Sequence, residues 1–256
     1  MISVLRKPVF VMAFILAQQA MAQPASSAAG EFNNQFQILF HDNLGPQSAS
    51  SVVDYLAQHF SRVMQELQVS DLPPVTVHLW ADYENLYAAQ EERYGQSYPG
   101  SGGSVWWPAD GPPEILAIYD ERYEGRRDHT ASLLHEFVHI LSVAINPTIS
   151  NNPRWLWESV AIYQAGQVRS GLAGIDYVAE GDYPTIEELT VGFNEANEAR
   201  NIYQFGYVIS EYIVETWGTE GLVSLIRSNG DIPETLGISE PQFNALWHAF
   251  MEEHYL

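Results

Sequence analysis

The chain has 256 residues, with 32 acidic and 11 basic side chains and a formal charge of −21 at pH 7. A surface this acidic repels nucleic acid and anionic membranes, so neither is expected as a partner. The chain has no cysteine, which excludes disulfides, thiolate metal sites and a lipoprotein anchor.

The N-terminus is typical of a signal peptide. Arg6 and Lys7 precede an apolar run, and a small-x-small cleavage site ends at Ala22. We therefore expect residues 1–22 to be cleaved during export to the periplasm or the medium, with an uncleaved membrane anchor as the alternative. Residues 23–31 are expected to be a flexible lead-in. No later stretch is apolar for long enough to span a bilayer, so the mature chain is not expected to insert into a membrane.

Residues 32–256 are predicted to form one α+β domain with a sheet lobe over about 32–145 and a helical lobe over about 146–256. Apolar content and alternation predict strands at residues 36–40, 75–80, 104–107 and 114–119. Apolar residues at helical spacing predict helices at residues 47–68, 82–94, 128–145, 153–167, 185–189, 199–217, 219–228 and 239–254. Gly218 is expected to end the helix predicted over 199–217.

The run His135-Glu136-Phe137-Val138-His139 lies within the helix predicted over 128–145. Residues four apart lie on one face of a helix, one turn apart, so both histidines can bind one metal ion. Glu136 projects beside them, toward any water that the metal carries. The His-Glu-x-x-His pattern is typical of zinc proteases because hydrolysis needs two neutral nitrogen ligands and a nearby carboxylate base. We therefore predict that Glu136 is the general base.

Glu158 is the predicted third ligand. Eighteen residues separate it from His139, which is enough to finish one helix, turn, and begin another. Pro153 is expected at the first position of that second helix, with Asn152 or Asn151 as its cap. Catalytic zinc commonly has three protein ligands and one open position for water, and two histidines with a glutamate form a known set. We predict one Zn²⁺ ion held by both histidines and Glu158.

The runs HEFVH and Trp-Leu-Trp-Glu-Ser-Val-Ala, with eighteen residues between His139 and the glutamate of the second run, resemble the gluzincin metallopeptidases, especially the secreted bacterial peptidase MA-like domains. The likeness extends over roughly residues 32–230. It implies a zincin-like fold and hydrolysis of peptide bonds in a peptide or protein substrate by a zinc-activated water. Ser159 stands where these families usually have glycine. Ile162 stands where a thermolysin-like enzyme has an acid, so the partners of the zinc histidines must come from elsewhere.

The resemblance also implies an oxyanion donor and a substrate-binding strand. Tyr203 lies in a run that resembles the Tyr-x-x-Gly of aminopeptidase-N-like enzymes, where the tyrosine stabilises the transition state. Tyr207, one helical turn later on the same face, is the alternative. Zincins bind an extended substrate along the edge strand above the metal helix, here residues 103–107. Trp106 and Trp107 are candidates to line a pocket beside it.

Three functions are open at this point, and an endopeptidase is favoured. The alternatives are a non-catalytic zincin-fold module that binds a peptide or protein, and a hydrolase of another bond on the same metal. The presence of Glu136 beside only three ligands favours an enzyme, because structural zinc is usually closed by four ligands. The chain lacks the Gly-Ala-Met-Glu-Asn stretch that captures a free amino terminus, which favours an endopeptidase over an aminopeptidase. Arg154 is a candidate partner for an acid near the site, and the oligomeric state is not predicted.

Overall fold

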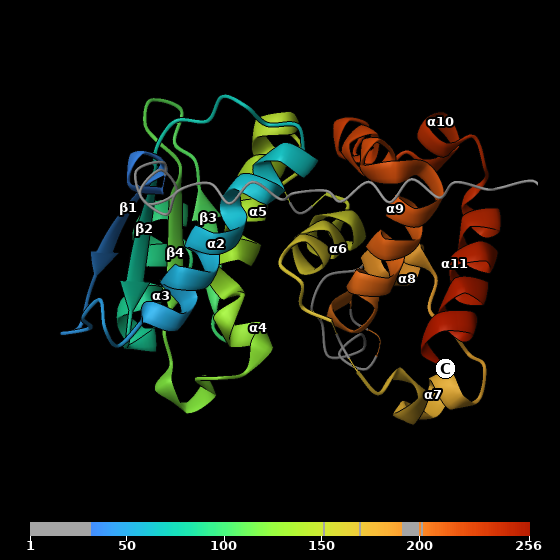
Figure 1. Ribbon diagram of the computed structural model, residues 1–256, viewed down its shortest axis with the longest axis horizontal. Helices are drawn as coiled ribbons and strands as arrows, with labels where there is room; N and C mark the ends of the chain where they lie inside the picture. Colours follow the sequence, from blue (N-terminus) through green and yellow to red (C-terminus); the bar gives the residue numbers. More distant parts are fainter. Residues whose placement is uncertain (1–31, 151, 169, 191–199, 201) are drawn as a thin grey trace, which may run out of the picture.

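The computed structural model describes residues 32–150, 152–168, 170–190, 200 and 202–256. The predicted signal peptide (1–22) and lead-in (23–31) lie outside this part of the chain. The described residues form a mixed α+β fold, with a sheet and its helices in one half and helices alone in the other (Figure 1). Among these residues, no helix is both long enough and apolar enough to cross a membrane.

The described residues contain a four-stranded sheet with the order β1-β2-β4-β3. Strands β1, β2 and β4 are parallel, and β3 is antiparallel to β4 at one edge of the sheet. The bounds are β1 Phe36–Phe40, β2 Val75–Trp80, β3 Gly103–Trp106 and β4 Glu114–Ile118. Each strand lies within one residue of its predicted position. Parallel neighbours need long connections, and α2 (Ser50–Glu66) links β1 to β2 while α3 (Tyr83–Tyr94) and β3 link β2 to β4.

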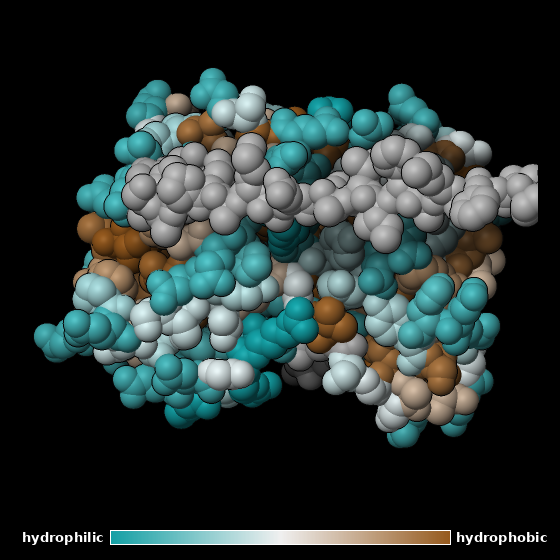
Figure 2. Space-filling model, in the orientation of Figure 1, coloured by the Kyte–Doolittle hydropathy of each residue, from teal (hydrophilic) through white to brown (hydrophobic). Residues whose placement is uncertain are grey.

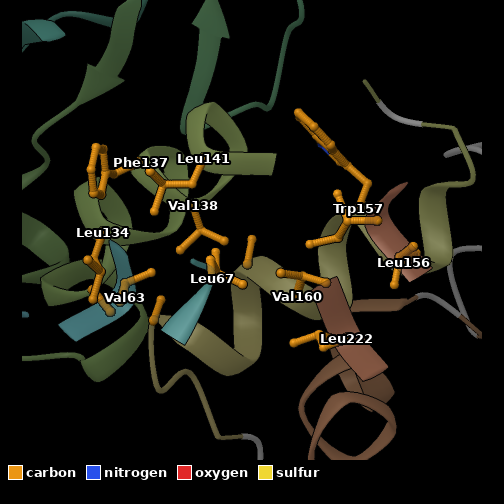
Figure 3. Close-up of a cluster of buried hydrophobic side chains, with 14 of the residues drawn as sticks. Val63, Leu67, Leu134, Phe137, Val138, Leu141, Leu156, Trp157, Val160 and Leu222 are labelled. Carbon is orange, nitrogen blue, oxygen red and sulfur yellow. The ribbon is translucent and has the colours of Figure 1, made fainter. Parts of the chain in front are cut away.

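The two faces of the sheet bury different cores because successive side chains of a strand point to opposite faces. Ile115 and Ala117 of β4 join the main core, which also contains the apolar faces of α2 and α5 (Ser132–Ile145). Leu116 and Ile118 join a smaller core with Leu86 of α3. Figure 3 shows part of the main core. Its labelled side chains come from α2 (Val63) and the residue just beyond its end (Leu67), from α5 (Leu134, Phe137, Val138, Leu141), from α6, which spans Arg154–Gln164 (Leu156, Trp157, Val160), and from α9, which spans Ile202–Arg227 (Leu222).

The second half of the described chain is helical, as predicted. Its helices are α6 Arg154–Gln164, α7 Asp176–Ala179, α8 Ile186–Thr190, α9 Ile202–Arg227, α10 Ile232–Leu236 and α11 Glu240–Tyr255. Within α9, Gly218 has φ 71° and ψ 177°, so the helix breaks where its end was predicted. The start predicted at residue 199 lies outside the described residues. The short α7 and α10, and two 3₁₀ turns at Glu121–Tyr123 and Leu172–Gly174, were not predicted.

Three local predictions were wrong. The predicted helix 128–145 is divided at Ala131 into α4 (Arg127–Thr130) and α5. Pro153 is the residue before α6 and not its first residue: its ψ is 149°, which is extended, and its carbonyl accepts the first helical hydrogen bond, from Trp157 N–H at 3.1 Å. The N-cap is Pro153 rather than Asn152, with no side-chain cap hydrogen bond, and Asn151 lies outside the described residues. Helix α6 ends at Gln164, three residues before the predicted end, because Gly166 adopts a left-handed conformation.

Helices α6 and α9 approach each other closely through Gly206. A Cβ atom on Gly206 would lie 2.8 Å from Cδ1 of Ile162 and 3.0 Å from Cα of Ser159. Both distances are shorter than ordinary van der Waals contacts, so only glycine fits at this position of α9. Serine at position 159, where the resembling families usually have glycine, thus faces a residue with no side chain.

Helices α5 and α6 face each other where the two halves of the molecule meet (Figure 1). Hydrophilic residues cover most of the face drawn in Figure 2, which is indented along its lower edge between the halves. The residues predicted to bind a metal lie on these two helices.

Candidate metal centre

Three predicted ligands come together between α5 and α6. His135 and His139 lie one turn apart on α5, with 3.1 Å between their Nε2 atoms. The Oε2 atom of Glu158 on α6 lies 3.4 Å from Nε2 of His135 and 3.8 Å from Nε2 of His139. All three residues are buried, with 8%, 4% and 6% of their surfaces exposed. In the part of the chain that the structure describes, this is the one group of three such side chains that could hold a metal ion.

The donor atoms of this group are suited to a cation. Oε2 of Glu158 is buried without a hydrogen-bond donor among the described residues, and it faces two imidazole nitrogens. A buried carboxylate oxygen without a partner is costly, and a positive ion among the three atoms removes that cost. The two imidazole rings are perpendicular, with 4.7 Å between their centroids, so their Nε2 atoms converge from different directions.

Another close histidine pair lacks this convergent geometry. Nε2 of His41 also lies 3.1 Å from a ring nitrogen, Nδ1 of His78. These rings, however, are within 8° of parallel and their centroids are 5.3 Å apart. Two coplanar imidazole rings that are joined end to end by an N–H···N hydrogen bond have their centroids about this far apart. The two nitrogens of this pair therefore point at each other, as in such a hydrogen bond. The same distance thus indicates a hydrogen bond in one pair and a chelating geometry in the other.

Arg154 lies against the other oxygen of Glu158. Its Nη2 atom is 3.7 Å from Oε1, one turn before Glu158 on the same helix. Burial alone would raise the pKa of Glu158, but the adjacent His135, followed by His139 and Arg154, lowers this pKa to about 2. Burial, followed by the neighbouring His135, lowers the pKa of His139 to about 3. The centre therefore offers a charged carboxylate and a neutral imidazole at neutral pH.

Glu136 lies next to the metal group and against strand β3. A Cβ atom on Gly103 would lie 2.8 Å from Cδ and 3.0 Å from Cγ of Glu136, so the carboxylate occupies the space beside the β3 backbone. Burial raises the pKa of Glu136 to about 7. A carboxylate with this pKa can accept and release a proton near neutral pH, which is the requirement for a general acid–base group.

The two histidines have different neighbours at Nδ1. Nδ1 of His135 lies 2.8 Å from Oε1 of Gln167. Nδ1 of His139 is buried, and no group in the described part of the chain forms a hydrogen bond with it. The ring of His139 instead stacks on the indole of Trp157, at 4.0 Å between centroids and 5° between planes.

The predicted tyrosines lie in different surroundings. The hydroxyl of Tyr203 is 3.4 Å from Nη2 of Arg154, beside Glu158. Burial, followed by the charge of Glu158, raises the pKa of Tyr203, so its hydroxyl stays protonated and can donate a hydrogen bond. The ring of Tyr207 lies 5.2 Å from that of Tyr163. The structure therefore brings Tyr203 to the metal group, whereas the described contacts of Tyr207 are with a different cluster.

The two tryptophans that were expected to line a pocket beside β3 do not form a pair there. Trp106 packs edge-to-face on Tyr94 of α3, at 5.3 Å, and belongs to the smaller core. Since Gly103 and Trp106 are three residues apart in a strand, their side chains point to opposite faces, and Trp106 points away from Glu136. Trp107 packs against the main core.

The sequence did not predict the contacts that three residues make in the centre. They are Gln167, Trp157, which lies in the motif around Glu158, and Gly103, which lies in the predicted edge strand. Trp157 directly precedes Glu158 and could have been noticed as a helix neighbour of the ligand. For Gln167 the available signal was Gly166, because glycine is the usual residue just beyond a helix end.

No family model matches the chain, and no curated protein matches it. The interpretation of this centre therefore depends on its own geometry.

Proposed function

We propose that this protein is an exported zinc-dependent peptidase with a zincin-like fold of the gluzincin type. The observation that carries the proposal is the convergence of His135, His139 and Glu158 beside Glu136, a partly buried carboxylate that lies against the edge strand β3. Neither the metal ligands alone nor the base alone would favour hydrolysis. Their combination next to the open edge of a sheet does.

The spacing of the three donor atoms supports zinc as the metal. In a tetrahedral site with bonds of about 2.0–2.1 Å, the ligand atoms lie about 3.3–3.4 Å apart. The three distances here are 3.1, 3.4 and 3.8 Å. A set of two imidazoles and one carboxylate leaves one tetrahedral position open, as in catalytic zinc sites. When bound, zinc would act as a Lewis acid toward the carbonyl and lower the pKa of the attacking water.

The chain's own residues would handle the protons and the charge. The carboxylate of Glu136 accepts a proton from the attacking water and then gives it to the amide nitrogen as the C–N bond breaks. The hydroxyl of Tyr203, protonated and beside Glu158, is the candidate donor to the carbonyl oxygen as that oxygen gains charge. Arg154 holds the outer oxygen of Glu158 and leaves Oε2 turned toward the histidines.

Strand β3 supports a peptide as the substrate. It is the last strand of the order β1-β2-β4-β3, and within the described residues no strand pairs with its outer side. An extended peptide can add to such an edge through main-chain hydrogen bonds, which do not depend on its sequence. Gly103 places that edge directly beside Glu136. A peptide bound there would pass the base, which favours internal cleavage of a peptide or protein.

The experiment that tests this function replaces Glu136 by glutamine in the mature chain, purified without a metal-binding tag. E136Q keeps the size of the side chain and removes its basicity, so we expect hydrolysis of a quenched fluorescent peptide library to fall about 10²–10⁴-fold. Zinc content per mole should stay close to that of the unmodified chain. The matched control is E187Q, because Glu187 is an exposed glutamate on α8.

Each possible outcome tests a different part of the proposal. Full activity of E136Q would eliminate Glu136 as the base. An unmodified chain that takes up no zinc, even after incubation with it, would eliminate the metal centre. Stoichiometric zinc with no cleavage of any peptide, but with peptide binding, would support the non-catalytic binding module instead.

A further inference from the structure

Helix α6 ends in a motif that turns the next side chain back toward α5. Gly166 has φ +69°, and its N–H donates to the carbonyl of Tyr163 at 2.9 Å. The N–H of Gln167 donates to the carbonyl of Ile162, also at 2.9 Å. This pair of hydrogen bonds is the Schellman motif, which needs a left-handed residue and so favours glycine. Gln167 is therefore fixed at its backbone before its side chain makes any contact.

The side-chain amide of Gln167 bridges two segments of the chain. Its Nε2 donates to the backbone carbonyl of Asp128 in α4, at 3.0 Å. A carbonyl can only accept, so the amide nitrogen must face Asp128 and the amide oxygen must face Nδ1 of His135. Nδ1 of His135 is 2.8 Å from that oxygen and must be the donor. In the neutral form of the ring, which is the form that binds a metal, the lone pair is then on Nε2, the atom that faces His139 and Glu158.

Helix α6 and the turn that ends it therefore supply neighbours to both nitrogens of His135. Glu158 lies beside Nε2 and Gln167 lies beside Nδ1, at opposite edges of one ring. His139 has no equivalent, because its Nδ1 is without a partner and its ring is held by stacking on Trp157. A change at Gln167 should therefore act on one ligand only.

We propose that Gln167 is a positioning residue that selects the Nδ1-protonated tautomer of His135 and so sets the metal affinity of the centre. The proposal deepens the proposed function, since it assumes that the three ligands bind a metal. Histidine ligands commonly donate their second nitrogen to a carboxylate, a carbonyl or water. Here a neutral amide accepts that hydrogen bond, and it adds no charge to a centre that already contains the carboxyl groups of Glu136 and Glu158.

The test compares two substitutions at position 167 with a control at the last residue of α6. Q167M keeps the length of the side chain but has no acceptor, whereas Q167E restores an acceptor without the amide donor. The control is Q164M. Gln164 is also buried, but its Oε1 accepts a hydrogen bond from Arg62 at 3.2 Å and not from one of the three metal-binding residues. Zinc affinity is measured by competition with a chromophoric chelator, and the tautomer of His135 by ¹⁵N NMR of the zinc-loaded chain.

We expect Q167M to bind zinc about 10–100-fold more weakly than the unmodified chain and Q167E to recover about tenfold of that loss. The ¹⁵N spectrum should show Nδ1–H for His135 in the unmodified chain and in Q167E. Q164M should lower thermal stability without changing zinc affinity.

Three results would overturn the inference. One is an unchanged zinc affinity in Q167M, another is an affinity of Q167E as low as that of Q167M, and the third is an equal loss in Q164M. These results can be told apart from a failure of the proposed function. If the proposed function is wrong, the unmodified chain will bind no zinc, or will bind zinc and cleave no peptide.

Discussion

The carboxylate of Glu136 lies against the backbone of Gly103, a residue 33 positions earlier in the chain on the edge strand β3. A single methyl group on Gly103 would come within 2.8 Å of Cδ of Glu136. Helix α5 and the edge strand β3 are thus in contact through the side chain of Glu136, the candidate base. Any change in that contact alters where the carboxylate points.

The first prediction follows from this contact. G103A should displace the carboxylate of Glu136 and lower kcat/KM of the proposed peptidase by about 10²-fold, because a misplacement of about 1 Å can cost that much. Zinc content should not change, since the three atoms nearest to a Cβ at position 103 all belong to Glu136 and none to a ligand. The control is G102A, whose Cβ would have its nearest neighbour, Cγ2 of Ile118, at 3.9 Å.

The melting temperature tests the same contact without an activity assay. In an E136A background the added methyl of G103A has room, so it should no longer lower the melting temperature. If G103A is equally destabilising with and without Glu136, the clash is with some other group.

Metal removal should destabilise the protein. Zinc at 100 times its Kd contributes about 2.7 kcal/mol to folding, which corresponds to roughly 5–10 °C in Tm for a chain of this size. We expect a chelator to lower Tm by this amount in the unmodified chain and in E187Q. In E158Q the chelator should have little effect, because the buried oxygen that faces both histidines has lost its charge. An equal shift in E158Q would show that the metal binds elsewhere.

Close packing of α6 on α9 yields a stability prediction. G206A should destabilise the fold by about 1–3 kcal/mol, because the new methyl group meets Ile162 at 2.8 Å and the backbone of Ser159 at 3.0 Å. Chemical denaturation measures this loss. G174A is the matched control, since a Cβ on Gly174 meets nothing within 4 Å. If the two substitutions cost the same, the tight contact between the helices is not the cause.

His248 should make stability depend on pH. Its Nε2 donates to the carbonyl of Pro184 at 2.8 Å, and burial lowers its pKa below the ordinary 6.5. Because the folded state resists protonation more than the unfolded chain does, stability is highest above pH 6.5 and falls as the pH drops below that value.

The measurement is the free energy of unfolding at about pH 7.5 and about pH 5, in a chelator, for the unmodified chain and H248Q. Glutamine can still donate to Pro184 but does not titrate. H248Q should therefore lose less stability on acidification. A loss equal to that of the unmodified chain would assign the pH dependence to other groups.

Much of the architecture could be predicted from local sequence. Alternating apolar residues placed all four strands within one residue, and helical spacing placed α2, α3, α9 and α11 within a few residues. These patterns are reliable because each reports which side of a single element is buried. Element ends were less reliable. Gly166, after which α6 cannot continue, was not used to predict the end of that helix. Ala131, where the predicted helix 128–145 is divided, is a residue type that gives no signal of a helix end.

The sequence by itself determined that His135 and His139 share one face of a helix, because four residues are close to one turn. It also allowed Glu158 to reach them, since eighteen residues suffice for a turn and a second helix. Only the tertiary structure decided that the Nε2 atoms lie 3.1 Å apart with Oε2 of Glu158 beside them, that Gln167 meets the other side of His135, and that Gly103 lies against Glu136. Helical periodicity fixes neighbours along one helix, whereas contacts between segments depend on how whole helices and strands pack, which no local pattern encodes.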